Sequence, residues 1–573
     1  MHRRLFFVLL VLCFSLSISS VAQQKLEHGT SAPWWKHAVF YEIYPRSYQD
    51  TTGDGIGDLN GITSRLDYLH DLGIDAIWIA PCFPSPLVDF GYDVSDYEGI
   101  DPQYGTLADF DHLVTEAQKR HIRILLDMVV NHTSDQHPWF IASRSSKTDP
   151  KRDWYIWWDG KLDKDGKMGP PNNWRSVFGG SAWTFDPTTN QYYYHRFYAQ
   201  QPDLNWRNPV VEKAMFDQMR FWLDRGVAGF RLDAVDTLLE DPTLGDEEYR
   251  RDAKGEIQKN FRGEPMLMGD KTSNLPEVHD IMRRMRAMID SYPGDRVLVG
   301  ETYLPNVLEL DKWYGGAAKD ELQLPMDTQV GVRSTLAPDV WRKRLEEAET
   351  SLHGSTPLLV YDNHDNPRLD RYCRVENGAA PGADCRQIQK MLETILFTSR
   401  AAALMYYGDE IGMSTMNPPP AERGRRRDAE RTPMQWTPGK NAGFSTSETT
   451  WLPIPPSYVT ANVEVEDKDP NSLLRWHKDL IALRRSNPVL RDGDQITFAT
   501  GNDKLVAYTR SIANKKILVI TNFSGVPQDA QMGAFAANKV RVLQANFKPD
   551  IEAGKLRKTF TVPAYGAFVA EIK

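Results

Sequence analysis

The sequence predicts an α/β protein: a parallel (β/α)8 TIM barrel with a domain inserted after its third strand and an all-β domain at the C-terminus. Three observations support this prediction. Eight short apolar runs alternate with amphipathic helical stretches, which is the pattern of a parallel barrel. The gap between the third and fourth runs is too long for a barrel loop. Beyond about Asn487, short alternating strands replace the helices, as in a small β-domain.

The expected elements follow one another along the chain. Strands are expected at Ala38–Tyr44, Ala76–Pro81, Ile122–Val130, Gly229–Val235, Arg296–Gly300, Leu322–Met326, Leu358–Tyr361 and Ala403–Tyr407. Helices are expected at Leu66–Leu72, Asp109–Arg120, Val211–Arg225, Pro276–Ser291 and Arg386–Thr398. We therefore expect barrel segments at 23–132 and 205–486, an inserted domain at 133–204 and a C-terminal domain at 487–573.

The N-terminus predicts export. Basic residues at positions 2–4 precede an apolar run from Leu5 to about Ile18, and small residues follow up to Ala22. This order is typical of a signal peptide, here residues 1–22. An uncleaved membrane anchor is the alternative, but the apolar run is short for a span. We expect a secreted or periplasmic protein with no membrane anchor after cleavage.

Charge and cysteine content narrow the possible functions. The formal net charge is −9, and the only dense basic run, Arg423–Arg427, is short. Nucleic acid is therefore not an expected partner.

Cys373 and Cys385 flank a short stretch rich in Gly, Ala and Pro, so in an oxidising compartment we expect them to form a disulfide. Cys82 would then remain alone and buried.

The stretch Gly229–Asp236 carries the most chemical information. Arg231 precedes Asp233 by two residues on an expected strand, so the two side chains point to one face. A guanidinium beside a carboxylate keeps that carboxylate ionised and aimed, as a carboxylate nucleophile requires. Taken alone, the pair is better explained as a structural ion pair.

Other expected strands also end in polar clusters. The third leads into Asp127–His132, the fifth into Glu301 and the seventh into Asn363-His364-Asp365. Active sites of such barrels lie at the C-terminal strand ends, so Asp233, Glu301 and Asp365 should converge. Mutual repulsion and desolvation would raise the pKa of one carboxyl, leaving a protonated acid beside an ionised base. Glycosidic bond cleavage needs such a pair.

Together with Gln201–Asn205, these motifs resemble those of the α-amylase superfamily of retaining glycoside hydrolases, and particularly its α-glucosidase and oligo-1,6-glucosidase branch. The resemblance extends from about Trp35 to the C-terminus. It implies that Asp233 is the nucleophile and Glu301 the general acid/base. It also implies that Asp365 stabilises the transition state by binding sugar hydroxyls.

The resemblance further implies a set of substrate-binding residues. By position these are Asp89, Tyr92, His132, Phe185, Phe197, Arg231, Ala234, His364 and Arg431. Arg431 would close the pocket together with Asp89, and the two phenylalanines would lie at its entrance. Ala234 would border the glycosidic bond. In the family, Val at this position accompanies α-1,6 preference, whereas Ala or Thr accompanies α-1,4 preference.

A loop near the first expected strand resembles the family's small metal loop. Its oxygen donors alternate as in a Ca²⁺ site, and the implied ligands are Asp50, Thr52, Asp54, Ile56 and Asp58. Gly61 stands where an EF-hand has an acid, so this is not an EF-hand. Thr52 stands where the family usually has Asn, and an Asp/Gly turn without metal is the alternative. No cofactor is expected for the chemistry.

The expected function is that of an exo-acting retaining α-glucosidase. It would cleave terminal α-linked glucose, with α-1,4 preferred, from maltose, sucrose or short oligosaccharides through a covalent glucosyl-Asp intermediate. Alternatives are a transglucosidase or sucrose isomerase using the same site, and a non-catalytic receptor or transporter subunit. Because Arg231 adjoins Asp233, we expect an acid limb of the pH–rate profile near or below about 4. Glu301 should set a basic limb around 6–7.

Overall fold

The computed structural model describes residues 32–162, 165–260, 263–416 and 426–573. The expected signal peptide and Arg423–Arg425 of the basic run lie outside these ranges. Residues Trp34–Lys573 form one compact unit. Within the described ranges, no helix has both the length and the apolar character needed to cross a bilayer.

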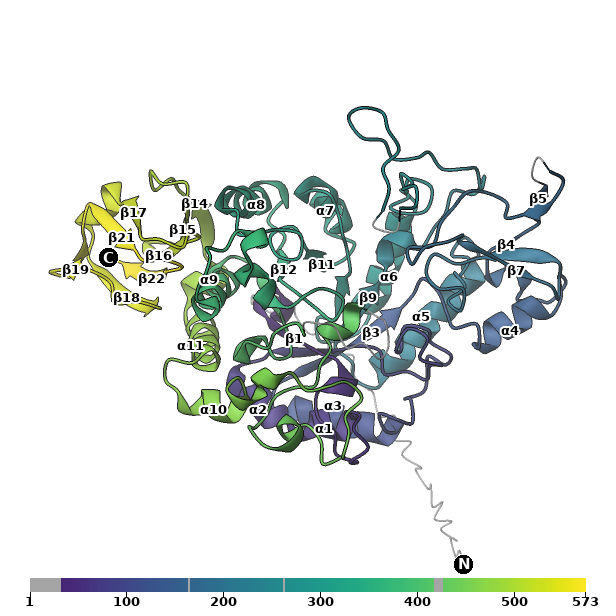
Figure 1. The fold of residues 1–573 in the computed structure, drawn as a ribbon, viewed down its shortest axis with the longest axis horizontal. Helices are drawn as coiled ribbons and strands as arrows, with labels where there is room; N and C mark the ends of the chain where they lie inside the picture. The colour runs from purple at the N-terminus through teal and green to yellow at the C-terminus, as the bar shows by residue number, and fades with distance from the viewer. Residues whose placement is uncertain (1–31, 163–164, 261–262, 417–425) are drawn as a thin grey trace, which may run out of the picture. The chain divides into compact units, whose positions relative to one another are not determined.

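Eight parallel strands close into a barrel (Figure 1), which confirms the predicted fold. They are β1 (Val39–Ile43), β2 (Ala76–Ile79), β3 (Arg123–Val129), β9 (Gly229–Asp233), β10 (Val297–Gly300), β11 (Leu324–Asp327), β12 (Leu358–Val360) and β13 (Ala402–Tyr406). Successive side chains alternate between the barrel interior and the helix layer. Phe40, Trp78 and Leu125 belong to one buried cluster, while Tyr41, Ile77 and Ile124 belong to a second, larger one. Both strand faces are therefore covered, which explains their continuous apolar runs.

Helices connect and surround the strands (Figure 1). They are α1 (Leu59–Ser64), α2 (Leu66–Leu72), α3 (Leu107–Lys119), α5 (Pro209–Asp224), α6 (Val278–Asp290), α7 (Val307–Trp313), α8 (Pro338–Ser351) and α9 (Cys385–Thr398), followed by α10 (Val463–Lys468), α11 (Leu473–Ser486) and α12 (Pro488–Asp492). Capping residues in the sequence fix where several of these helices begin. Thr106 and Asp109 form a capping box on α3, and Asn208 caps α5 just before Pro209, which satisfies N–H groups that have no partner within the helix.

The predicted insertion lies between β3 and α5. It contains α4 (Pro138–Ser145), a hairpin of β5 (Lys161–Leu162) and β6 (Met168–Gly169), and a three-stranded antiparallel sheet of β4 (Trp157–Trp158), β8 (Gln191–Tyr194) and β7 (Trp183–Asp186). Its own small core contains Trp174, Trp183 and Tyr194. Aromatic residues that set this stretch apart in the sequence therefore pack against one another in the insertion's own core.

The C-terminal domain is an antiparallel sheet in the order β14 (Asp494–Thr497), β15 (Leu505–Ile512), β16 (Lys515–Asn522), β22 (Ala567–Ile572) and β18 (Val540–Ala545). A second pair, β17 (Gln528–Gln531) and β21 (Thr559–Val562), packs with it around a separate apolar cluster, and the short pair β19 (Ile551–Glu552) and β20 (Lys555–Leu556) lies alongside. The sheet contacts α8, α9 and α12 and contributes no residue to the cavity described below.

Cys373 and Cys385 form a disulfide with their Cα atoms 5.2 Å apart, and Cys82 is free and buried. We expect that replacing both bridged cysteines with Ala lowers the free energy of unfolding by at most about 3 kcal/mol, because the closed loop is short. Thermal unfolding of the oxidised wild type and of the double variant measures this. As a control, a reductant should leave the melting temperature of the double variant unchanged. A loss far above this bound would show that the cysteines contribute more than loop closure.

Candidate active site

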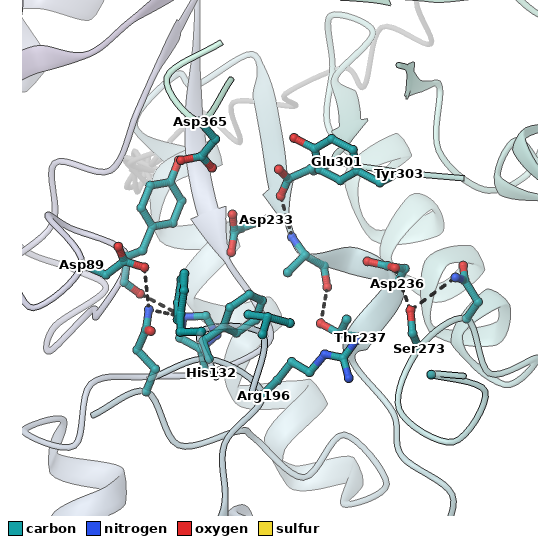
Figure 2. A pocket seen from close by; sticks show the side chains of 18 of the residues that line it. Asp89, His132, Arg196, Asp233, Asp236, Thr237, Ser273, Glu301, Tyr303 and Asp365 are labelled. Carbon is teal, nitrogen blue, oxygen red and sulfur yellow. Dashed lines mark hydrogen bonds between the residues drawn. The ribbon is translucent and has the colours of Figure 1, made fainter. Parts of the chain in front are cut away.

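A cavity of about 850 Å³ lies at the C-terminal ends of the barrel strands (Figure 2). It is lined by eight of the residues expected from the sequence: Asp89, Tyr92, His132, Phe197, Asp233, Ala234, Glu301 and Asp365. Asp233, Glu301 and Asp365 face the same space from three different strand ends, as Figure 2 shows. Arg231, His364 and Arg431 are almost completely buried and contact the lining residues from beneath.

Arg231 holds the candidate catalytic carboxylates together. Its Nη1 donates to Asp233 Oδ1 at 2.7 Å and to Asp127 Oδ1 at 2.9 Å, and its Nη2 lies 2.9 Å from Glu301 Oε2. The guanidinium is fully buried and also lies over the Trp78 ring at 4.8 Å. One cation therefore serves three carboxyl groups, so it cannot fully neutralise any one of them.

Burial outweighs Arg231 in setting the pKa values of this cluster. Desolvation raises the pKa of Asp233 to about 7, although Arg231 acts in the opposite direction. Desolvation, with repulsion from Asp233 and Asp365, raises the pKa of Glu301 to about 8. The pKa of Asp233 is thus shifted opposite to the direction expected from the adjacent Arg231 alone, because Arg231 is shared among three carboxyl groups and the site is deeply buried.

Asp365 has the opposite electrostatic environment. Arg427 Nη1 and Arg431 Nη2 donate to its Oδ1 at 2.7 and 2.6 Å. These guanidinium groups, together with His364 and Arg231, hold the pKa of Asp365 below its ordinary value despite burial. Asp365 is therefore the carboxylate of the three that stays ionised most firmly.

The arginine predicted to pair with Asp89 is a different one. Arg427 Nη2 contacts Asp89 Oδ1 at 2.7 Å, whereas Arg431 donates to the backbone oxygen of His364 at 2.7 Å and to Asp365. The sequence prediction placed Arg431 in this role, four residues too late in the same motif. Arg427 bridges Asp89 and Asp365 and thus closes the inner end of the cavity.

His132 lies against this inner end. Its Nε2 is 3.1 Å from the Tyr92 backbone oxygen and 3.1 Å from Gln201 Nε2, and its ring contacts Phe197 at 5.0 Å. Burial lowers the pKa of His132 to about 3, so the ring is neutral near pH 7. Gln201 also donates to Asp89 Oδ2 at 3.3 Å, which links the Gln201–Asn205 motif to the cavity.

Phe185 does not line the cavity, contrary to the sequence prediction. It lies 43% exposed on β7 and contacts Tyr192 on the neighbouring strand. Phe178 takes the expected place at the cavity wall. It stacks on Tyr198 at a centroid distance of 4.0 Å and lies beneath Arg427 at 5.4 Å. Strand alternation turns Phe185 outward, and the sequence pattern around it does not reveal which face is buried.

The strand carrying Asp233 is shorter than predicted. β9 ends at Asp233, and Ala234 adopts a left-handed conformation with φ 47° and ψ 40°. This turn aims the Ala234 N–H at Glu301 Oε2, 3.2 Å away (Figure 2). Ala234 therefore lies at the cavity surface between the two candidate catalytic carboxyls.

The expected metal loop is held together by its own N–H groups. Asp50 accepts from the backbone of Thr52, Gly53 and Gly55, and Asp58 accepts from Thr51 and Gly61. The Asp54 side chain accepts from the Ile56 N–H at 2.8 Å. A cation would compete with these donors for the same oxygens. Calcium binding by this loop stays a prediction, and the chemistry discussed below does not depend on it.

Part of the segment between β9 and α6 lines the cavity, which the sequence did not reveal. Arg250, Met268 and Asp270 line the cavity from this segment. The insertion holds the segment in place: Asn172 and Trp174 donate to backbone oxygens of residues 244 and 245 at 3.0 Å, and Arg175 pairs with Glu264 at 2.7 Å. The unusual length between the fourth strand and the next helix was the available signal.

Comparisons with known proteins agree with this geometry. The family model described as the alpha amylase catalytic domain matches residues 42–493. The chain is 38% identical over 536 residues to an oligo-1,6-glucosidase of Parageobacillus thermoglucosidasius, covering 86% of this chain and 90% of the relative. It is 38% identical over 564 residues to a probable alpha-glucosidase of Rhizobium meliloti (strain 1021), covering 94% and 97%.

Among solved structures, the trehalulose synthase MutB from Pseudomonas mesoacidophila MX-45 superimposes with a TM-score of 0.83 at 33% identity, covering 95% of this chain and 100% of that one. The family match spans most of the barrel, and the relatives match nearly end to end. The chain therefore belongs to the α-amylase family and is a glycoside hydrolase of the α-glucosidase type.

Proposed function

We propose that the protein is an exo-acting retaining α-glucosidase that releases terminal glucose from maltose, sucrose or short oligosaccharides and prefers α-1,4 linkages. One observation carries this proposal: a single buried guanidinium, that of Arg231, holds Asp233 and Glu301 together at one cavity wall. Two carboxyl groups that contact the same guanidinium lie close to each other, as a nucleophile and an acid acting on one glycosidic bond must.

In the proposed reaction, Asp233 attacks the anomeric carbon while Glu301 gives its proton to the leaving glycosidic oxygen. The bond to that oxygen breaks, and a glucosyl ester forms on Asp233. Glu301, now a carboxylate, then takes a proton from a water molecule that attacks the same carbon and frees Asp233. Two inversions give net retention, so α-glucose is the first anomer released.

Asp365 is suited to the positive charge that develops on the sugar. Arg427 and Arg431 keep it ionised, and it faces the same space as Asp233 (Figure 2). A fixed carboxylate accepts hydrogen bonds from sugar hydroxyls and stabilises an oxocarbenium-like transition state. Because the Arg427–Asp89 pair closes the inner end of the cavity, a chain could not extend past the first glucose, which supports exo action.

The proposed α-1,4 preference rests on Ala234, at the cavity surface beside Glu301. We expect maltose to be cleaved better than isomaltose, and Ala234→Val to shift the ratio of kcat/KM values toward isomaltose. The two added methyl groups should crowd a glucose held at C4 more than one held by its longer C6 arm. Such differences are worth about 1–3 kcal/mol, or roughly 10–200-fold. Isomaltose preference in the wild type, or an unchanged ratio in the variant, would refute this proposal.

Strain must be separated from specificity in that experiment. Ala234 has a positive φ, and a β-branched residue is poorly tolerated there. Ala234→Gly is the matched control, because Gly favours this conformation and adds no methyl group. The control should leave the linkage ratio near that of the wild type, and the melting temperatures of both variants show how much strain Val adds.

The proposed roles also predict the pH–rate profile. Asp233 must be ionised, so kcat/KM should fall as the pH drops below its pKa of about 7. Glu301 must be protonated, so kcat/KM should fall as the pH rises above its pKa of about 8. We expect a narrow bell between these limits on maltose, measured in buffers of constant ionic strength. A profile flat down to about pH 4, the ordinary range of Asp, would show that Arg231 outweighs burial.

A second candidate reaction is transglucosylation or sucrose isomerisation, favoured by the close structural match to a trehalulose synthase. It would use the same glucosyl intermediate, with a sugar hydroxyl in place of water. Arg250, Met268 and Asp270 line the cavity and would hold that acceptor. Product analysis on sucrose separates the reactions: equal glucose and fructose supports hydrolysis, whereas an isomeric disaccharide supports isomerisation.

Export also belongs to the proposal. The signal-like residues 1–22 support a secreted or periplasmic location that suits hydrolysis of external sugars. N-terminal sequencing of the mature protein tests this, and a mature chain that keeps residue 1 would contradict it.

A further inference from the structure

Glu42 lies on β1 beneath the active site, and no step of the proposed reaction uses it. Its side chain is fully buried, and its Oε1 is 2.5 Å from His364 Nδ1. In the described part of the chain, no arginine or lysine lies within ion-pair distance of Glu42, and its Oε2 has no hydrogen-bond partner. An ionised carboxylate in this position would carry a poorly compensated buried charge, which is costly.

A chain of contacts leads from Glu42 to the candidate catalytic carboxyls. His364 Nε2 is 2.7 Å from the Tyr92 hydroxyl and 3.4 Å from Asp365 Oδ2. The Tyr92 hydroxyl is 2.9 Å from Asp127 Oδ2, and Asp127 accepts from Arg231, which also holds Asp233. The Tyr92 and His364 rings stack with 12° between their planes, so this geometry is closely packed.

The number of hydrogens that each group can donate identifies the donors in this series of contacts. Asp127 accepts from Arg231 and from Trp78 Nε1–H, so it is an acceptor, and Tyr92 spends its single hydrogen on it. The 2.7 Å contact between Tyr92 and His364 then requires an Nε2–H on His364. A neutral imidazole has only one N–H, so Nδ1 presents a lone pair to Glu42. The hydrogen in that 2.5 Å contact must come from the Glu42 carboxyl.

The surrounding charges favour this arrangement over an imidazolium–carboxylate pair. Burial lowers the pKa of His364 well below its usual value, opposed by Asp365 and reinforced by Arg431, Arg231 and Arg427. Burial raises the pKa of Glu42 well above its usual value; Arg231 and the His364 backbone N–H, which donates to Glu42 Oε1 at 3.4 Å, oppose this rise, and Asp365 and Asp127 reinforce it. Tyr406, on β13, also faces Glu42. Both pKa directions keep the shared proton on Glu42.

We propose that Glu42 is a positioning residue: as a neutral carboxylic acid it donates to His364 Nδ1 and fixes the tautomer whose Nε2–H faces Tyr92 and Asp365, two residues that line the cavity. The identity of this cavity as the glucose subsite rests on the proposed function. In this arrangement His364 donates to the Tyr92 hydroxyl, and Tyr92 donates to Asp127. The side chain of Glu42 thereby orders groups that contact substrate without touching substrate itself.

Two variants and one control test the proposal. In Glu42→Gln, the side-chain amide can still donate to Nδ1, so kcat/KM on maltose should stay within a few-fold of the wild type. Its pH profile should superimpose on that of the wild type, because the group it replaces does not ionise in the working range. Glu42→Leu has no donor, so His364 can adopt the other tautomer. By analogy with residues that orient metal-ligating histidines, whose loss costs about 10–100-fold, we expect a fall in kcat/KM of that order.

Glu410→Gln is the matched control for neutralising a buried glutamate. Glu410 is also fully buried and accepts from Tyr41 and Tyr68, outside the cavity. This change should alter the melting temperature but not the pH profile or KM. If Glu42→Leu loses no more activity than this control, the positioning role is refuted. A shifted pH profile in Glu42→Gln would also refute it, because it would show that Glu42 is ionised and supports an imidazolium.

Nitrogen-15 NMR of histidine-labelled enzyme provides a readout independent of turnover. His364→Gln assigns the resonance, and the proposal requires an unprotonated Nδ1 and a protonated Nε2 in the wild type. A protonated Nδ1 would overturn it. This measurement separates the two proposals: if the wild type does not hydrolyse α-glucosides, the proposed function fails, while the tautomer of His364 is still determined.

Discussion

Asp233→Asn and Glu301→Gln are each expected to remove most hydrolytic activity while leaving the fold intact. Without the Asp233 carboxylate no glucosyl ester can form, and loss of a nucleophile costs roughly 10⁴-fold or more in kcat. Loss of general acid catalysis by Glu301 should cost about 10²–10⁴-fold. Kinetics on maltose measure both losses, and NMR of the first product should show α-glucose. Release of β-glucose would contradict the retaining mechanism.

The two roles can be distinguished by the leaving group. The 4-nitrophenolate leaving group of 4-nitrophenyl α-glucoside needs little protonation. Glu301→Gln should therefore slow the formation of the glucosyl ester much less with this substrate than with maltose. Asp233→Asn should lose activity on both substrates alike. Equal losses for Glu301→Gln on the two substrates would argue against its role as the acid.

The melting temperature of Glu301→Gln relative to the wild type provides a control, because the direction of its change with pH can be predicted. The folded-state pKa of Glu301 is raised to about 8, so the native state loses stability as the pH rises from the ordinary Glu pKa of about 4.3 to that value, and no further above it. The Gln variant has no such group. Its melting temperature should therefore equal or exceed that of the wild type, with the difference growing up to about pH 8 and staying constant above it, and an inactive variant that is also unfolded would fail this control.

Replacing Arg427 with Gln is expected to have the second-largest effect. The change leaves Asp89, which is 4% exposed, without its ion-pair partner and removes one of two guanidiniums from Asp365. Removing one partner of a buried pair costs about 3–5 kcal/mol, so we expect kcat/KM on maltose to fall at least roughly 10²-fold, mostly through KM.

A double-mutant cycle decides which arginine pairs with Asp89. Arg427→Gln and Asp89→Asn should be strongly coupled in kcat/KM, because the two side chains are 2.7 Å apart. Arg431→Gln is the matched control: it should couple to Asp365→Asn, its contact at 2.6 Å, and only weakly to Asp89→Asn. Strong coupling of Asp89 to Arg431 instead would support the assignment predicted from sequence and contradict the structure.

The sequence by itself determined the barrel, the insertion, the C-terminal sheet and the three convergent carboxyls. Strand and helix periodicities are local, and a parallel barrel brings all its C-terminal strand ends to one face. Residues such as Asp233, Glu301 and Asp365 could therefore be placed together without knowing any contact between them.

Only the tertiary structure decided the features that depend on burial and on the path of loops. The pKa of Asp233 follows from its depth and from an Arg231 shared among three carboxyls, and sequence adjacency shows neither. Arg427, in the 3₁₀ helix Arg426–Ala429, rather than Arg431 reaches Asp89, because the fold and not the motif sets where this helix lies. Phe178 replaces Phe185 at the cavity wall because strand pairing sets which face is turned outward. Glu42 and His364, 322 residues apart, meet only because β1 lies two strands from β12 in the closed barrel.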